Sequence, residues 1–164
     1  MIFETERLLI RKLIFSDLNQ FHLLESNPNV LRYAAGNVKS LKENEIELKK
    51  LIDSYKKSNN DFWIYAIERK IDARFIGTVA LVKHYNDDEI GYRFLEKYWG
   101  NGYGFEICKG LISYCKTIGI KKIVAFAVDE NIASVKILKR LQFIPIEKLI
   151  NEKHQQETKY QLFL

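Results

Sequence analysis

Three glycines at alternate positions, Gly100, Gly102 and Gly104, separate a strand-like segment from a helix-like segment of this sequence. Residues 89–95 before them are apolar and aromatic, and the residues after them repeat apolar side chains at helical spacing. A chain that enters a helix through such a turn leaves several backbone N–H groups unpaired at the positive end of the helix dipole. The pattern therefore predicts an anion site of the kind that binds phosphate.

Two common nucleotide-binding motifs do not fit this glycine turn. A Rossmann fingerprint requires a third glycine where Gly100-x-Gly102 places Phe105. A P-loop requires Gly-Lys-Ser/Thr, and that tripeptide does not occur in the sequence. The turn needs its context before a ligand can be assigned.

The composition indicates one ordinary globular domain. A chain of 164 residues, 47% apolar and 29% charged, can bury one sizeable core. The net charge of +5 comes from 26 basic and 21 acidic residues that are mixed along the chain, with no basic stripe and no recognition motif. This excludes nucleic-acid binding as the leading function and supports a modest attraction for small anions.

Neither a membrane span nor a metal site is predicted. The first residues, MIFETERLLIRKL, carry five charges, unlike a signal peptide, and no uncharged apolar run reaches spanning length. A cytoplasmic protein is therefore expected. Cys108 and Cys115 have no His or Cys partner at metal-ligand spacing and are interpreted as small buried hydrophobes. His22, His84 and His154 are isolated and are interpreted as surface or structural residues.

Periodicity and turn signals divide the chain into alternating elements. Ser16 offers a cap for a helix that ends before Pro28, and Ser40 with Glu43 forms a capping box for a helix to about Lys57. Further helices are expected from Gly104 to Gly119 and after Asn131. Strands are expected at residues 7–13, 62–69, 74–83, 89–95, 123–128, 143–149 and 158–164, with a turn at residues 86–88.

These elements predict a single mixed α/β domain over residues 1–164. The strands at 62–69, 74–83 and 89–95 follow one another through short links, so an antiparallel meander is the simplest pairing. The helix after the glycine turn then forms a crossover to the continuous apolar run at 123–128, which makes a parallel pair.

The glycine turn and three other segments resemble the GNAT acetyltransferase superfamily, and within it the RimJ/RimL type of N-acetyltransferase. The acetyl-CoA loop of that family, Gln/Arg-x-x-Gly-x-Gly/Ala, matches WGNGYG at residues 99–104. TERLLIRKL at 5–13, EIGY at 89–92 and DENIASVKILKRLQF at 129–143 agree as well, in the family order. The resemblance implies a mostly antiparallel, twisted sheet of about seven strands with one splayed parallel pair, flanked by about four helices.

The resemblance also implies the activity and its co-substrate. The family moves an acetyl group from acetyl-CoA to a primary amine by direct attack on the thioester in a ternary complex, without a metal. The CoA pyrophosphate would be held by backbone N–H groups, and the pantetheine arm would run between the splayed strands. The cofactor-binding residues implied here are Asn101, Gly102, Tyr103, Gly104 and Phe105 for the pyrophosphate and Phe94, Leu95 and Asn131 for the arm. As a helix N-cap, Asn131 is also explained without a ligand.

The catalytic residues are less clearly specified. Many family members carry a tyrosine that protonates the CoA thiolate where this chain has Leu138, and Ser134 is the expected substitute. The usual first loop residue and the glycine of the Leu-Gly-Phe triplet are replaced by Trp99 and Gln142. Glu89 is the first candidate for the general base, because some members use a glutamate there. Glu152 is the second, by resemblance to RimL-type enzymes.

The acceptor amine is not specified by the sequence. Protein N-termini, polyamines, antibiotics and other amines are all acceptors in the family, and residues 27–57, with Tyr33 and Trp63, are expected to form much of the pocket. A non-catalytic acyl-CoA sensor of the same fold is the alternative, since the tyrosine is missing. The oligomeric state also stays open, with a homodimer the commonest assembly of soluble oligomers.

Overall fold

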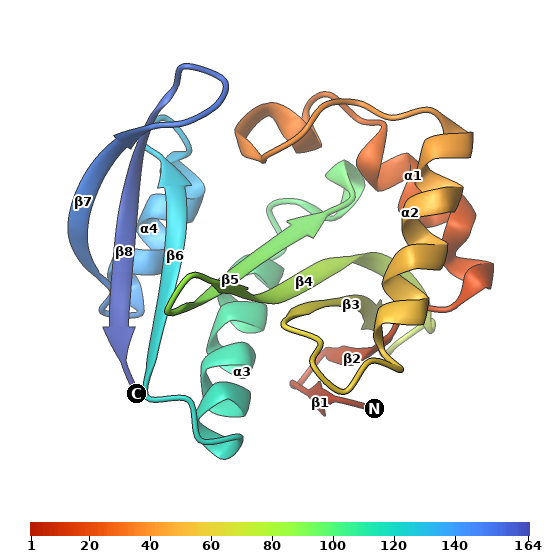
Figure 1. Cartoon of the computed structure of the whole chain (residues 1–164), viewed down its shortest axis with the longest axis horizontal. Helices are drawn as coiled ribbons and strands as arrows, with labels where there is room; N and C mark the ends of the chain where they lie inside the picture. The colour runs from red at the N-terminus through yellow and green to blue at the C-terminus, as the bar shows by residue number, and fades with distance from the viewer.

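The computed structural model describes residues 1–164, with the side chain of residue 84 left out, and is built on one eight-stranded sheet (Figure 1). The strand order is β1-β2-β3-β4-β5-β6-β8-β7, and every neighbouring pair is antiparallel except β5 and β6. The strands are β1 (Phe3–Glu4), β2 (Leu8–Lys12), β3 (Phe62–Arg69), β4 (Arg74–His84), β5 (Asp87–Phe94), β6 (Lys122–Val128), β7 (Ile144–Ile150) and β8 (Gln156–Phe163). The predicted mixed α+β architecture, with a meander followed by one parallel pair, is confirmed.

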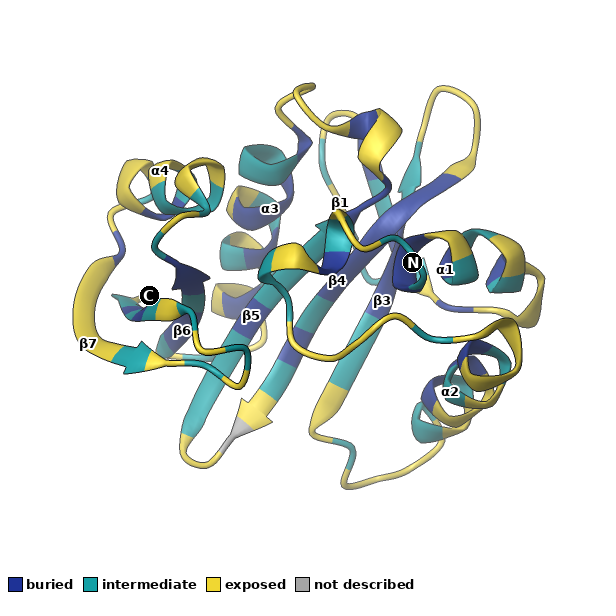
Figure 2. Ribbon diagram, turned by 90° about the horizontal axis from the view of Figure 1, so that it is seen from above, coloured by how far each residue is buried: buried dark blue, intermediate teal, exposed yellow. Residues whose placement is uncertain are grey.

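Four α-helices cover the two faces of the sheet (Figure 2). They are α1 (Leu18–Glu25), α2 (Leu41–Ser54), α3 (Tyr103–Thr117) and α4 (Ile132–Arg140), with short 3-10 turns η1 (Phe15–Asp17), η2 (Val30–Tyr33) and η3 (Glu96–Tyr98). Side chains alternate between faces along a strand, so the contacts of β5 assign each helix to a face. Arg93 bonds Glu25 of α1, while the ring of Phe94 lies 6.0 Å from that of Tyr103 in α3. Helices α1 and α2 therefore cover one face and α3 and α4 the other.

Helix boundaries follow the predicted signals at α2, α3 and α4. The predicted Ser16 cap of α1 is wrong, because Ser16 lies inside η1 and the N-cap of α1 is Asp17. Ser40 and Glu43 form the expected capping box, although α2 ends at Ser54 rather than near Lys57. Asn131 caps α4 by accepting a hydrogen bond from the N–H of Ser134 at 3.3 Å. Gly119 takes φ +86° directly after α3, which is the left-handed conformation that glycine adopts at low cost. The local sequence thus sets where these helices begin and end.

Three details of the strands differ from the prediction. The short β1 was not expected, because two residues give no periodic signal. The turn predicted at residues 86–88 is instead formed by Tyr85 and Asn86, and β5 begins at Asp87. The carboxylate of Asp87 binds Lys122 and Lys159 of the neighbouring strands, which holds that residue in the sheet.

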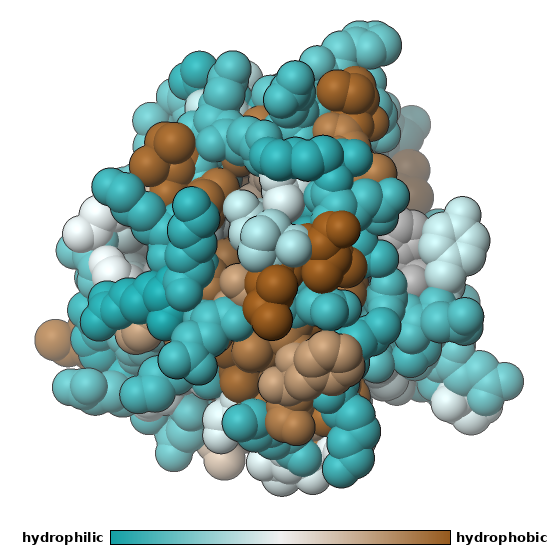
Figure 3. Space-filling view, turned by 90° about the vertical axis from the view of Figure 1, so that its left-hand side faces the viewer, coloured by the Kyte–Doolittle hydropathy of each residue, from teal (hydrophilic) through white to brown (hydrophobic). Residues whose placement is uncertain are grey.

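The sheet ends in an exposed edge. Pro145 lies in β7, which is compatible with proline because the outer side of this strand has no partner strand. Figure 3 faces this end of the molecule and shows apolar side chains gathered on it. Exposed apolar residues of β7 and β8 are Ile144, Ile146, Ile150 and Phe163.

The core is formed by the inward faces of the strands and helices. Both cysteines are buried with free thiols, as expected. Among the largest fully buried side chains are Leu8, Ile10, Phe21, Leu48, Ile67, Ile76, Ile107 and Leu111. Ile118 is 49% exposed, although it continues the apolar spacing of its helix, because it lies past the last residue of α3.

The parallel pair is the feature that positions the site. β5 and β6 are in register only at Asp88 with Ile123 and Glu89 with Val124. Beyond Glu89 the two strands separate, and the gap lies beside the first turns of both α3 and α4 (Figure 1). The sheet therefore opens at its middle.

Candidate functional site

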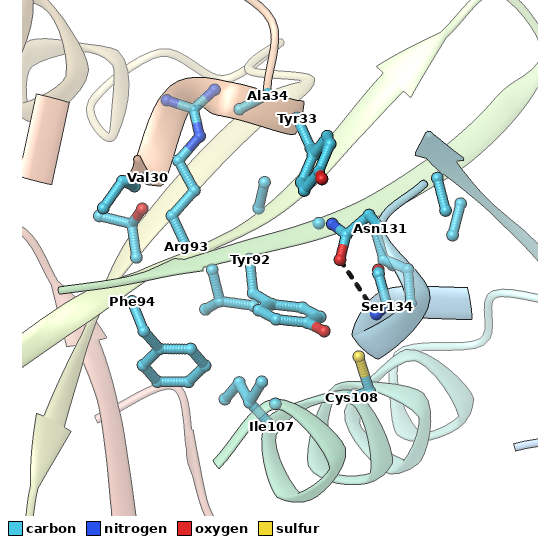
Figure 4. A pocket seen from close by; sticks show the side chains of 18 of the residues that line it. Val30, Tyr33, Ala34, Tyr92, Arg93, Phe94, Ile107, Cys108, Asn131 and Ser134 are labelled. Atoms are coloured by element: carbon cyan, nitrogen blue, oxygen red, sulfur yellow. Dashed lines mark hydrogen bonds between the residues drawn. The ribbon is translucent and has the colours of Figure 1, made fainter. Parts of the chain in front are cut away.

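A cleft of about 1190 Å³ occupies the gap between β5 and β6 (Figure 4). Its walls come from β5, β6, the first turns of α3 and α4, and η2 with the residues that follow it. The wall includes residues that point to both faces of the sheet, such as Glu89 and Tyr92 of β5. A ligand on one face can therefore reach a ligand on the other through the sheet.

The glycine turn forms the end of the cleft on the α3 face. Gly100 and Gly102 take φ +75° and +79°, and Gly102 is the N-cap of α3 without a side-chain cap. The first helical hydrogen bond runs from the N–H of Glu106 to the carbonyl of Gly102. The N–H groups of residues 103–105 therefore point out of the helix end, as an anion site requires.

An ion pair to the N-terminal segment fixes this turn in place. The carboxylate of Glu106 accepts hydrogen bonds from Thr5 Oγ1 at 2.6 Å and from the backbone N–H and Nε of Arg7 at 2.8 and 2.7 Å. Burial alone would raise the pKa of Glu106, but these bonds outweigh it and the pKa is lowered. Arg7 also donates to the carbonyl of Asn101 at 3.0 Å. Glu106 thus has a further role beside its place near the helix dipole.

Tyr92 brings a phenol hydroxyl to the point where α3 and α4 meet. Its hydroxyl faces Ser134 (Figure 4), whose side chain lies near enough to lower the phenol pKa, and a Cβ at residue 104 would lie 3.1 Å from that oxygen. Figure 4 shows the ring extending from β5 with the hydroxyl toward Ser134 and Cys108. Burial raises the pKa of the phenol, with a smaller contribution from Cys108, so the hydroxyl stays protonated at neutral pH. Burial also raises the pKa of the Cys108 thiol to about 12.

Two carboxylates lie at the opposite mouth of the cleft, on the face of α1. Glu89 begins the separated part of β5, and Glu157 lies near the start of β8. The pKa of Glu157 is raised by burial and then by the charges of Glu89 and Asp129. The cleft therefore has hydroxyl groups on one side of the sheet and carboxylates on the other.

The loop between β7 and β8, residues 151–155, is bonded to residues 31–36 over this mouth. Lys153 Nζ donates to the carbonyls of Leu31 and Ala34, both at 2.7 Å. The N–H of Gly36 donates to Glu152 Oε1 at 2.8 Å, and Gln155 Nε2 donates to the carbonyl of Arg32 at 3.1 Å. We call these contacts the latch. Glu152 is thus engaged in the latch and is not part of the cleft wall.

Most of the predicted site residues are brought together by the fold. The cleft wall contains Glu89, Phe94, Gly102, Tyr103, Gly104, Phe105, Asn131 and Ser134, together with Tyr33. Leu95, Asn101, Glu152 and Trp63 are outside it. Leu95 is buried, and its N–H and C=O bond Ile76 and Tyr98. The side chain of Asn101 donates to the carbonyls of Tyr98 and Trp99 and so holds the turn.

Two residues of the cleft, Tyr92 and Glu157, were not predicted. Tyr92 belongs to the EIGY segment, which indicated a resemblance to the family but no role in the site. Glu157 follows a polar link and gives no motif. Within the described part of the chain, no group of three His, Cys, Asp or Glu side chains could hold a metal ion. No described helix is both long enough and apolar enough to cross a membrane.

Comparisons with known proteins assign the class. The sequence model of the acetyltransferase (GNAT) domain matches residues 7–144. An uncharacterized N-acetyltransferase of Bacillus subtilis, YoaA, is 29% identical over 147 residues, which cover 87% of this chain and 82% of the relative. The chain therefore belongs to the GNAT acetyltransferase family and is an acyltransferase, and its family supports acetyl-CoA-dependent N-acetyl transfer.

Solved structures share the fold. A RimL ribosomal L7/L12 alpha-N-protein acetyltransferase in complex with coenzyme A superposes with a TM-score of 0.83, at 17% identity, covering 98% of this chain and 96% of that chain. Spermidine N-acetyltransferase from Vibrio cholerae, in complex with CoA and spermine, gives a TM-score of 0.81 at 21% identity, with 96% and 95% covered. Identities at this level establish the fold of this chain and leave its acceptor open.

Proposed function

We propose that this protein transfers the acetyl group of acetyl-CoA to a primary amine by direct attack in a ternary complex. The observation that carries the proposal is the cleft through the sheet, with unpaired N–H groups of residues 103–105 at one end and the carboxylates Glu89 and Glu157 at the other. An anionic donor and a cationic acceptor would thus approach from opposite faces. Residues 1–164 would work as one domain, of the RimJ/RimL type that the EIGY and WGNGYG segments resemble.

The residues present fit CoA as the donor. The unpaired N–H groups of Tyr103, Gly104 and Phe105 suit the pyrophosphate, and a Cβ at residue 104 would fill part of the cleft at 2.9 Å from Ile137 Cδ1. Asn101 acts by holding the loop, and Asn131 borders the path of the pantetheine arm. The groups that could pair with that arm belong to β5 beyond Glu89, where β6 has separated, with Phe94 near its end. Leu95 would act only by closing the turn.

Ser134 and Tyr92 are the residues that would act as the general acid. Leu138 is buried and has no proton to give, while the Tyr92 hydroxyl faces Ser134 within the cleft (Figure 4). A hydroxyl pair at this place would donate a hydrogen bond to the leaving sulfur as negative charge develops there. This supports turnover over the sensor alternative, because Tyr92 of β5 would supply the hydroxyl that Leu138 of α4 lacks.

The general base would be one of the two carboxylates on the α1 face, Glu89 or Glu157. Glu89 lies where β5 and β6 part, so it faces the point at which an amine from that mouth would meet the thioester. An amine with a pKa near 10 must lose a proton before it can attack. The solved relatives named for spermidine and for a ribosomal protein both use amines, which supports an amine acceptor of this general kind.

Calorimetry with CoA and a thiol-release assay test the proposal. We expect CoA to bind with measurable heat, and acetyl-CoA to release free thiol when a panel of spermidine, aminoglycosides and peptides with free N-termini is offered. Binding without thiol release from any amine would favour the sensor alternative. The absence of any heat or thermal stabilisation with CoA would contradict both readings of the site.

A further inference from the structure

We propose that Glu157 takes the proton of the acceptor, as one of a carboxylate pair with Glu89 that binds the acceptor as a protonated primary amine. The inference rests on the proposed function and assigns the general base and the residues that bind the ammonium within it. Among the described side chains no cation of the protein forms an ion pair with Glu157, and the ammonium group of an acceptor would supply that charge.

The strand register places both carboxylates on one face of the sheet. Glu89 is in register with Val124 of β6, and Glu157 is in register with Val128 of the same strand. Val124 and Val128 are four residues apart and share a face, as do residues directly opposite on neighbouring strands. Both glutamates line the cleft. β6 lies between the strands that carry them, so they stand on the two sides of β6, four residues apart along it. They face the same cleft, and the charge of Glu89 reaches Glu157 and helps to raise its pKa.

The cations on the elements around Glu157 are engaged with other groups. Lys159, two residues along β8, binds Asp87 at 2.7 Å, and Lys148 of β7 binds Asp129. Arg93 of β5 binds Glu25 at 2.7 Å, and Arg32 of η2 lies 5.1 Å over the ring of Tyr33. Each of these four side chains, within the part of the chain that the structure describes, thus has a partner other than Glu157.

Apolar groups complete the surroundings. Glu157 lies opposite Leu149 of β7, and the cleft wall near it includes Phe126 and Ile150. Burial and the two neighbouring acids oppose the negative charge of Glu157 and raise its pKa. A general base works best when its pKa approaches the operating pH. Glu157 thus suits proton transfer, and we assign the binding of the ammonium to Glu89, at the point where β5 and β6 part.

Each proton in the proposed step has a defined donor and acceptor. The bound R–NH₃⁺ gives one proton to Glu157, and the nitrogen lone pair forms the C–N bond with the thioester carbon. As the C–S bond breaks, its electron pair stays on sulfur, which takes up one proton through the Ser134 and Tyr92 hydroxyls. The nitrogen loses its second proton to water, which resupplies the hydroxyls, and Glu157 then returns its proton to water. The products are the amide, CoA thiol and one proton.

Kinetics of E157Q test the base. Glutamine keeps the shape and removes the carboxylate, so we expect kcat/KM for the acceptor to fall by about 10²–10⁴-fold, the usual contribution of a general base, with CoA affinity unchanged. The matched control is E147Q on the exposed strand β7, which removes the same charge outside the cleft. In wild type the acidic limb of the kcat/KM profile is expected above the ordinary glutamate pKa, and E89Q should move it to lower pH. E157Q activity equal to that of E147Q overturns the assignment.

A titration without turnover separates this inference from the proposed function. The carboxyl of Glu157 is followed by NMR in ¹³C-glutamate-labelled protein, with butylammonium chloride against sodium chloride at equal ionic strength. We expect butylammonium, and separately E89Q, to lower the Glu157 pKa. If neither changes it, the carboxylates form no shared ammonium site, whatever the enzyme acetylates. If both lower it while CoA fails to bind, the proposed function fails and the ammonium site stands.

Discussion

At the scale of single residues, the cleft is defined by side chains that arrive from elements far apart in sequence. Tyr92 stands on β5 and Ser134 on α4, yet the Tyr92 hydroxyl faces Ser134 in the cleft (Figure 4). Gly104 carries no side chain where the Tyr92 hydroxyl approaches α3. Gly104, which the sequence assigns to phosphate binding, thus also leaves space for the hydroxyl of Tyr92.

Replacing Tyr92 by phenylalanine tests that donor. Y92F keeps the ring and removes the hydroxyl, so we expect kcat to fall by about 10²-fold, the lower end for acid catalysis, with CoA affinity retained. Because burial raises the phenol pKa above its usual value, the hydroxyl is protonated from about pH 6 to 9 in wild type. The profiles of the two enzymes should therefore run parallel over that range.

The control for this change is Y114F. Tyr114 lies on α3 with its ring 5.1 Å from that of Phe3, away from the cleft wall. It should keep kcat near wild type, because its hydroxyl takes no part in the reaction. Equal kcat values in Y92F and wild type would contradict a role for the Tyr92 hydroxyl, and Ser134 would then be the only proposed proton donor.

Sequence reasoning located the donor half of this site better than the acceptor half. The glycine turn, the Asn131 cap and Ser134 are local signals, since each depends on residues close in sequence. Tyr92 and Glu157 enter the cleft because β5 and β6 separate, and that separation depends on pairing between strands that lie far apart in the chain. No local pattern reports it. Glu152 was predicted as a candidate base but lies outside the cleft. Nothing in its polar link indicates that its carboxylate accepts a hydrogen bond from the N–H of Gly36.

At the scale of elements, the hairpin of β7 and β8 is tied to the segment after η2. Strand and helix positions were predictable because alternation, capping boxes and terminal glycines are local, and β3 was predicted at its observed bounds, residues 62–69. The latch was not predictable, since its partners within residues 31–36 are all backbone groups, which carry no residue-type signal. It closes the acceptor mouth on one side.

Removing Lys153 tests the latch. K153A deletes the ammonium that bonds the carbonyls of Leu31 and Ala34. Hydrogen bonds to charged groups contribute about 1.5–3 kcal/mol, and part of this is replaced by water, so we expect the acceptor KM to rise about 10-fold. CoA affinity should not change, because the glycine turn lies on the other face. Hydrogen exchange should become faster in residues 31–36.

A lysine elsewhere on the surface provides the control. Lys57, just beyond α2, is exposed and lies outside the cleft wall. K57A should alter neither the acceptor KM nor exchange in residues 31–36. If K153A behaved in the same way, the mouth would be ordered by the backbone of the two loops, and Lys153 would be incidental.

At the scale of the whole molecule, the sheet consists of two parts, β1 to β5 and β6 to β8, which meet at two register pairs between β5 and β6. This short junction is what leaves the cleft open. Asp87 reinforces it from the closed end, binding Lys122 of β6 at 2.6 Å and Lys159 of β8 at 2.7 Å. One carboxylate thus joins three strands at the base of the opening.

The ion pairs of Asp87 should make the stability of the fold depend on pH. The hydrogen bonds from Lys122 and then Lys159 lower the pKa of Asp87 to about 2, against about 3.9 for aspartate in an unfolded chain. A carboxylate with a lowered folded pKa stabilises the native state at pH above the unfolded value, and this stabilisation is lost as the pH falls through the folded value. We expect D87N to remove about 1 kcal/mol near pH 7, since partly exposed pairs are screened, and so to lower Tm by about 2–4 °C.

Thermal unfolding of wild type and D87N from pH 7 to pH 2 measures this effect. The two Tm curves should stay apart above about pH 4 and converge toward pH 2, because the protonated Asp87 carboxyl and the carboxamide of the D87N variant are then both uncharged. Added salt should narrow the gap at pH 7. D53N, at an exposed Asp of α2 that is 69% accessible, should leave Tm unchanged. A gap that persists undiminished at pH 2 would mean that Asp87 holds the strands through shape or neutral hydrogen bonds, and that charge does not join the two parts of the sheet.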